Sequence, residues 1–142
     1  MTACPLCDTP GGATLWQDDF CRVVLADEPD YPGFLRVILN AHVKEMSDLA
    51  SADQRRLLDV VLAAEAALRA VMTPDKINLA SLGNVVPHLH WHVIPRFADD
   101  PHFPNPVWGE RKRPARRAAP ADLAVQLGTA LSRRLARARG TE

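Results

Sequence analysis

The sequence predicts an α+β fold: an antiparallel sheet of about five strands with one long helix on one face and a second helix at the C-terminus. Short runs rich in β-branched and aromatic residues recur along the chain, and a single long segment with helical spacing of apolar residues interrupts them. A length of 142 residues fits one ordinary domain. We expect residues 1–100 to hold the sheet and the long helix, and residues 101–142 to add a loop rich in proline and arginine and the last helix of the same domain.

The expected elements follow from these patterns in order. Ser51 and Gln54 have the spacing of a capping box at the start of the long helix, which ends at Thr73 and Pro74. Leucines recur every fourth residue over 123–135, which predicts a terminal helix with one narrow apolar stripe. The five expected strands cover residues 13–17, 20–26, 34–39, 77–81 and 89–94.

The charge and the cysteine content limit the classes of function. Seventeen basic residues balance seventeen acidic ones, so the charge gives no reason to expect nucleic acid or an anionic membrane as a partner. The first residues do not have the pattern of a secretory signal, and no run reaches the roughly 18 apolar residues of a membrane span. We therefore expect a cytoplasmic protein whose three cysteines are thiols or metal ligands rather than a disulfide pair.

Three histidines alternate with apolar residues in the last expected strand. Successive side chains of a strand point to opposite faces, so His88, His90 and His92 are expected on one face, with the long helix covering the other. Three interpretations are open: polar positions on a half-exposed sheet, a metal site, or covalent catalysis in which one imidazole attacks phosphorus and its neighbour handles a proton. Imidazole suits both catalytic tasks because its pKa of about 6.5 leaves a neutral nucleophile and an available acid near pH 7.

The histidine segment resembles the signature of the histidine triad family of nucleotide hydrolases and transferases. The run from His88 to Ile94 matches the pattern His-φ-His-φ-His-φ-φ, where φ is apolar, and the similarity covers about residues 4–97. The resemblance implies a homodimer that hydrolyses adenosine phosphoramidates, dinucleoside polyphosphates or related nucleotide conjugates at the α-phosphate, through a nucleotidyl-histidine intermediate. A nucleotidyltransferase and a nucleotide-binding module with little turnover are the alternatives.

The resemblance also implies roles within the triad. His90 is the expected nucleophile, His92 is expected at the scissile phosphate and the leaving group, and His88 completes the catalytic set. Histidine rather than glutamine at His92 favours hydrolysis over transfer. Trp108 is expected near the active site of a neighbouring subunit, and Arg96 is a candidate for contact with phosphate.

Three further residues are candidates for substrate binding. Asp27 is similar to the ribose-binding acid of the family, although a turn aspartate explains it equally well. Asn78 and Asn84 are candidates for contacts to phosphate, or polar residues of a strand and a turn. Two positions depart from the family pattern, because Val85 replaces a hydroxyl residue and Phe34 replaces a further histidine.

Cys4 and Cys7 have the two-residue spacing that lets both sulfurs reach one metal ion. The resemblance implies a structural zinc, because several bacterial members hold zinc with such a pair, a histidine at the place of His42 and the first triad histidine, His88. The chemical step itself would require no cofactor. The alternative is a pair of reduced thiols beside a surface histidine.

Overall fold

The computed structural model describes residues 3–138 and confirms the expected α+β fold. One antiparallel sheet has the strand order β1-β2-β3-β5-β4. The strand containing the histidines begins only at His90, so His88 lies in the segment before it rather than in the predicted row of three. The strands are β1 (Ala13–Gln17), β2 (Cys21–Leu25), β3 (Leu35–Leu39), β4 (Lys76–Ala80) and β5 (His90–Arg96).

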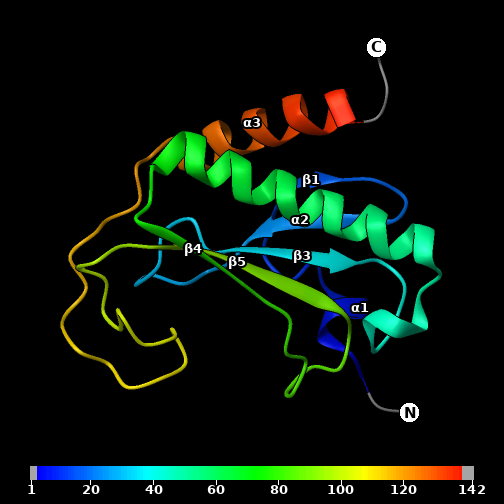
Figure 1. Cartoon of the computed structure of the whole chain (residues 1–142), viewed down its shortest axis with the longest axis horizontal. Coiled ribbons are helices and arrows are strands. Elements are labelled where there is room, and N and C mark those ends of the chain that lie inside the picture. The colour runs from blue at the N-terminus through cyan, green and yellow to red at the C-terminus, as the bar shows by residue number, and fades with distance from the viewer. Residues whose placement is uncertain (1–2, 139–142) are drawn as a thin grey trace.

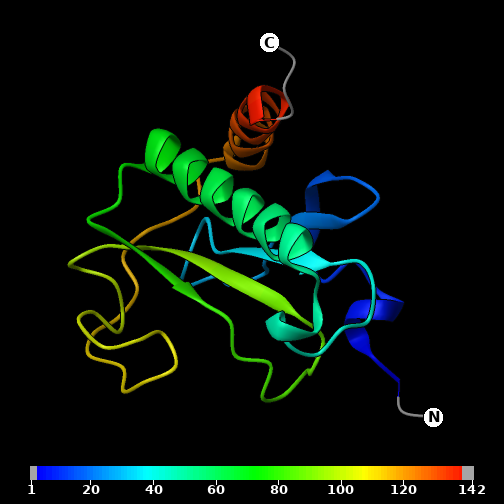
Figure 2. The same cartoon turned by 45° about the vertical axis from the view of Figure 1, so that its right-hand side comes forward.

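Two helices form layers on one side of this sheet. The long helix α2 (Ser51–Met72) lies across one face, and α3 (Leu123–Ala138) lies on the outer side of α2 and against β1 (Figures 1 and 2). Two short helices, α1 (Pro5–Asp8) and η1 (Met46–Asp48), lie outside these layers. Within residues 3–138, none of the helices has the length and apolar character needed to cross a membrane.

The start of α2 differs from the predicted capping box. Ala50 is the N-cap residue and Ser51 is already helical, so no side chain caps the first turn. The Gln54 amide instead donates to the carbonyl oxygens of Met46, at 3.2 Å, and Leu49, at 3.0 Å, and so joins the helix to the preceding turn. The predicted end is confirmed, because Thr73 adopts the left-handed conformation with a φ of 46° that closes many helices.

The core lies between α2 and the sheet. Trp91 and Val93 of β5 point toward α2, as the alternation of a strand requires. Leu58 and Leu62 are 37% and 54% exposed, so the buried stripe of α2 is rotated away from these two leucines. The residues that α2 buries are Leu57, Val60, Val61, Ala64, Ala67 and Leu68.

The face of the sheet opposite α2 carries the polar residues of the central strands. His90 pairs with Ile38 of β3, and His92 pairs with Arg36 of the same strand. Cross-strand partners share a face, so Arg36 lies beside His92 on the open side of the sheet. The β3–β5 register therefore brings a cation and two imidazoles together.

Candidate active site

A cleft of about 560 Å³ lies over this open face of the sheet. Its lining includes His90, His92, Arg36, Asn84 and Trp108. This volume falls in the range of small-molecule sites. A cleft with two imidazoles and a guanidinium in its walls suits an anionic ligand of the size of a nucleotide.

The hydrogen bond of His90 determines which of its ring nitrogens can react. Its Nδ1 lies 2.6 Å from the carbonyl oxygen of His88. A carbonyl oxygen only accepts hydrogen bonds, so Nδ1 must carry the proton. In the neutral ring the lone pair then resides on Nε2, which is the form required of a nucleophile or a general base.

His92 is enclosed by rings. Its ring centroid lies 4.9 Å from that of His90, 5.0 Å from Trp108 and 5.6 Å from Phe34, with all three neighbours edge-on. Within residues 3–138 no hydrogen bond reaches its ring nitrogens, and its Nδ1 is buried without a partner. Burial, together with the nearby His90 and Arg36, lowers the pKa of His92 to about 4. The ring is therefore neutral at pH 7.

His88 faces away from the cleft, toward the two N-terminal cysteines. Its Nε2 donates to the carbonyl oxygen of Leu39 at 2.6 Å, which leaves the lone pair on Nδ1. This Nδ1 lies 3.4 Å from the Sγ of Cys4 and 3.5 Å from the Sγ of Cys7, and the Nδ1 of His42 lies 3.3 Å from the Cys7 sulfur. The four donor atoms lie within 4.8 Å of one another, and two thiols with two imidazoles are a donor set that binds zinc tetrahedrally.

The structure places the three predicted substrate residues in different surroundings. Asn84 lines the cleft, and the neighbouring Val85 is 93% exposed. Asp27 is exposed just after β2 and does not line the cleft. The Oδ1 of Asn78 accepts a hydrogen bond from Arg96 at 2.7 Å, so this amide is already engaged within the protein. The structure thus brings only Asn84 to the histidines.

Arg96 and its neighbours form a buried polar cluster beyond the end of β5. Its guanidinium pairs with Asp100 at 2.7 Å, with both side chains at least 96% buried, so it does not reach phosphate in the cleft. Hydrogen bonds from Arg96 and from backbone amides lower the pKa of Asp100 to about 2, although burial opposes them. The Tyr31 hydroxyl contacts Asp100 and lies 2.6 Å from Nδ1 of His102, and its pKa rises to about 12 mainly through burial.

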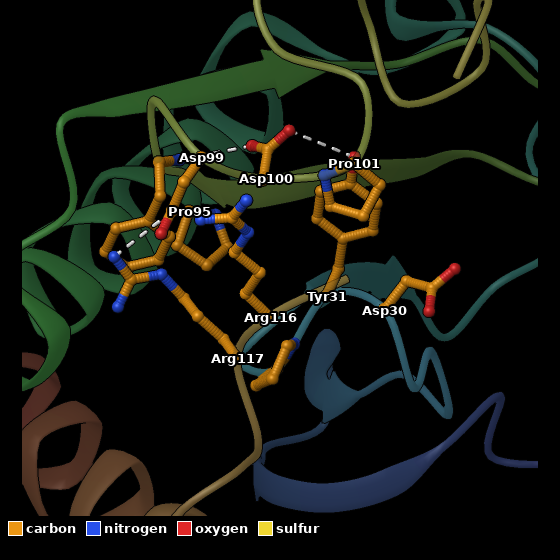
Figure 3. Close-up of a pocket in the computed structure, with 10 residues that line it drawn as sticks. Asp30, Tyr31, Pro95, Asp99, Asp100, Pro101, Arg116 and Arg117 are labelled. Atoms are coloured by element: carbon orange, nitrogen blue, oxygen red, sulfur yellow. Dashed lines mark hydrogen bonds and ion pairs between the residues drawn. The ribbon is translucent and has the colours of Figure 1, made fainter. Parts of the chain in front are cut away.

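A small second cavity adjoins this cluster. Figure 3 shows Asp99 and Arg117 on one side of it and Tyr31 with Pro101 on the other. Its volume of about 10 Å³ holds roughly one water molecule, which excludes a nucleotide. The cluster fixes the chain after β5, and the same segment carries Trp108 back to His92 of its own chain.

Arg36 is a charged residue of the cleft to which the sequence pattern gives no role. The apolar and branched residues of 34–39 predict a strand whether or not the single arginine among them has a function. The signal was present, because an arginine between Leu35 and Val37 in a strand that is otherwise apolar needs a polar partner or a ligand.

Comparison with known proteins identifies a family model and several similar proteins. The model of the HIT domain matches residues 12–99. The chain is 26% identical over 120 residues to the AP-4-A phosphorylase of Mycobacterium tuberculosis, covering 80% of this chain and 62% of that relative. The chain thus spans less than two thirds of the length of this curated relative.

Several solved structures share the fold. A histidine triad protein from Bradyrhizobium japonicum is 29% identical, with 88% of this chain and 91% of that chain covered and a TM-score of 0.72. A second one, from Sinorhizobium meliloti, is 28% identical, with 94% and 96% covered and a TM-score of 0.73. A zinc-bound histidine triad family protein from Mycobacterium smegmatis is 23% identical, with 96% and 97% covered and a TM-score of 0.68, a likeness that shows the fold alone.

Proposed function

The chain belongs to the HIT domain family, and from this premise we propose that it hydrolyses nucleotide conjugates at the α-phosphate through a nucleotidyl-histidine intermediate. The observation that carries the proposal is the orientation of His90 in the cleft. Its Nδ1 is committed to the His88 carbonyl, so Nε2 is the free nucleophile. Adenosine is the nucleoside proposed from the family resemblance, and the curated AP-4-A phosphorylase supports a substrate of this class.

The first step forms a bond between Nε2 of His90 and the α-phosphorus. The bond from phosphorus to the leaving group breaks, and its electron pair leaves with that group. The carbonyl of His88 stabilises the positive charge that develops on the ring, because the Nδ1 proton already points at it. His92 is proposed to contact the transferred phosphoryl group, since its ring lies beside His90 and its nitrogens have no partner among the described residues.

In the second step an acceptor oxygen forms a bond to the phosphorus, the P–N bond breaks, and its electron pair returns to Nε2 of His90. When the acceptor is water, one of its protons is released to the solvent. Water as the acceptor releases a nucleoside monophosphate, which is the proposed reaction. Inorganic phosphate as the acceptor would release a nucleoside diphosphate, and the phosphorylase among the relatives supports this second candidate.

Asp27 and Asn78 remain predicted substrate residues, whereas Asn84 is proposed to bind substrate from its place in the cleft.

Zinc is proposed as a structural ion held by Cys4, Cys7, His42 and His88. The fit rests on the donor set and on the bond from His88 to Leu39, which turns the lone pair of Nδ1 toward the sulfurs. Four protein ligands complete a tetrahedral zinc ion and leave no position for substrate. The ion would hold the His88 backbone, whose carbonyl orients His90, and it would take no part in the bond changes.

The decisive experiment is to trap the intermediate. The protein is incubated with adenosine phosphoramidates and with dinucleoside polyphosphates, with and without inorganic phosphate, and the released nucleotides are separated. We expect nucleoside monophosphate and an acid-labile nucleotidyl group on His90. His90→Gly should lower turnover by at least about 10⁴-fold, as the loss of a covalent nucleophile does, while retaining the melting temperature within a few degrees. Ordinary turnover by His90→Gly would refute the assignment, and a nucleoside diphosphate that requires phosphate would identify the transferase.

A further inference from the structure

Arg36 is a cation of the cleft without an ionic partner. It projects from β3 beside His92 and is partly buried. Its Nη1 donates to the carbonyl oxygen of Gly11 at 3.3 Å, and its guanidinium carbon lies 5.6 Å from the centre of the Phe34 ring. No carboxylate within residues 3–138 forms an ion pair with it. Arg36 lines the cleft, and a guanidinium has five N–H donors, of which the hydrogen bond to Gly11 uses one.

The two buried arginines, Arg22 and Arg96, show how this protein satisfies a guanidinium inside the fold. Arg22 donates to the side chain of Asn40 and to the backbone carbonyls of Leu6, Thr9 and Pro10. Arg96 pairs with Asp100 and with further oxygen acceptors. Arg36 differs from both, because it is partly buried and lines the cleft with no carboxylate beside it, a position in which a guanidinium can pair with an anion of the ligand.

The strand register gives the position of Arg36 along the sheet relative to His90. Arg36 pairs with His92, whereas the nucleophile His90 pairs with Ile38, two residues farther along β3. This offset is about 7 Å along the sheet, so Arg36 is displaced from the attacking nitrogen toward the side of His92. The α-phosphorus must lie at the nucleophile, and a displaced cation suits a second phosphate bonded to it.

We propose that Arg36 binds the phosphate next to the α-phosphate, so that the enzyme selects phosphoanhydrides over phosphoramidates of uncharged amines. The inference rests on the proposed function and specifies its leaving group. When His90 attacks, the P–O bond of the anhydride breaks and the electron pair remains on the departing phosphate oxygen. The guanidinium neutralises this developing charge, and no proton needs to be supplied.

The environment of His92 also favours phosphoanhydrides over phosphoramidates as substrates. An amine leaving group departs with the electron pair of a P–N bond and must take up a proton. Burial, and then the neighbouring His90 and Arg36, hold the pKa of His92 near 4, so its ring carries no proton to donate at pH 7. A phosphate leaving group needs none.

The first test compares two substrates in Arg36→Gln. The anhydride substrate is diadenosine tetraphosphate and the amidate is the benzylamide of adenosine monophosphate. We expect Arg36→Gln to lower kcat/KM for the anhydride by about 100-fold, the loss typical of one transition-state donor, and to change the amidate by less than about threefold. Arg36→Lys should restore part of the loss, and Arg111→Gln removes an exposed arginine outside the cleft as a matched control. Equal losses on both substrates would overturn the inference.

The second test does not depend on turnover. Equilibrium binding of ADP and AMP is measured for the full-length wild-type protein and for Arg36→Gln. We expect the Kd for ADP to rise about tenfold, as the loss of about 1.4 kcal/mol implies, and the Kd for AMP to change less than twofold. An equal effect on both ligands, or none on either, refutes the role of Arg36. If the wild-type protein hydrolyses neither substrate but Arg36→Gln loses affinity for ADP selectively, the anion site is supported. Only the proposed hydrolytic function is then refuted.

Discussion

Each histidine of the segment 88–92 takes its chemical state from the atoms that its ring faces. His88 and His90 both donate to backbone carbonyls, but with opposite ring nitrogens, so their lone pairs point to the cysteines and to the cleft respectively. His92 has no such partner among residues 3–138 and is neutral because it is desolvated beside other rings and a cation. Three residues of one type thus have three different chemical environments.

The buried His92 should make folding stability depend on pH. Its pKa is about 4 in the folded protein and about 6.5 in an unfolded chain. The unfolded chain therefore binds more protons between these values, and stability falls as the pH drops from about 6.5 to 4. We predict that the free energy of unfolding falls over this pH range by up to about 3 kcal/mol less in His92→Asn than in the wild type.

Urea unfolding of both proteins at pH 7 and at pH 4.5 measures the difference. The zinc ligands are the same in the two proteins, so their own titration cancels in the comparison. Identical pH dependence in wild type and His92→Asn would show that His92 does not hold this low pKa.

The pair Arg96–Asp100 should be far more important for stability than an exposed pair. Asp100→Asn leaves a guanidinium that is 2% exposed without its anion, and we predict a loss of about 3–5 kcal/mol in the free energy of unfolding. Asp30→Asn breaks the pair with Arg111, in which both side chains are more than 40% exposed, and should cost at most about 1 kcal/mol. Denaturant unfolding of the two variants tests the ranking, and losses of similar size would contradict the buried geometry.

At the scale of elements, the N-terminal segment is tied to the site through the proposed zinc ligands. Cys4 is the N-cap residue of α1 and Cys7 lies within this helix, whereas His42 follows β3 and His88 precedes β5. An ion shared by these residues joins three separate parts of the chain. The same segment supplies Gly11, whose carbonyl accepts the hydrogen bond from Arg36.

Removal of one sulfur should therefore release the metal and loosen this region. We predict one zinc per chain in the purified protein and less than about 0.2 in Cys7→Ser, with a fall in the melting temperature of at least about 4 °C, since structural zinc contributes to folding energy. A chelator should lower the melting temperature of the wild type and leave that of Cys7→Ser unchanged. Metal analysis and thermal unfolding measure both effects. A wild-type protein without zinc and with the stability of the variant would rule out the structural ion.

The elements could be predicted from the sequence where their signals are local. The five strands and the helices α2 and α3 carry their own periodicity, so the expected elements match the observed ones with their ends shifted by a few residues. The predicted capping box was wrong because Gln54 bonds to the preceding turn, a choice set by the path of that turn. The position of His88 depends on a similar contact, since the N–H of Leu89 donates to the carbonyl oxygen of Val43, beyond the end of β3, and β5 begins only at His90.

The candidate site was predictable in part. The triad and the four metal-ligand candidates are recognisable from their spacing and from the family resemblance. The position of Arg36 beside His92 depends on the register of β3 and β5. The cluster around Arg96 depends on contacts between residues about 70 apart in the chain, such as Tyr31 with Asp100 and His102. Spacing along the chain carries no information on such contacts.

At the scale of the whole molecule, the sheet has one edge that a second chain can use. Within residues 3–138, β4 pairs only with β5, so its outer edge presents unpaired backbone groups. Leu79 on this strand is 39% exposed, and Leu62 of α2 is 54% exposed. Exposed strand edges flanked by apolar side chains are surfaces on which sheets of two subunits join. The opposite edge, β1, lies against α3.

We therefore predict a homodimer that forms through the edge of β4. Sedimentation equilibrium should give twice the 15.6 kDa mass of one chain for the wild type. Leu79→Asp places a charge on the joining edge, and we expect it to raise the dissociation constant of the dimer by at least about tenfold, because burying an unpaired carboxylate is costly. Val125→Asp introduces the same charge on α3, where Val125 is 71% exposed, and should leave the dimer intact. A dimer that survives Leu79→Asp but dissociates in Val125→Asp would place the interface at the opposite edge of the sheet.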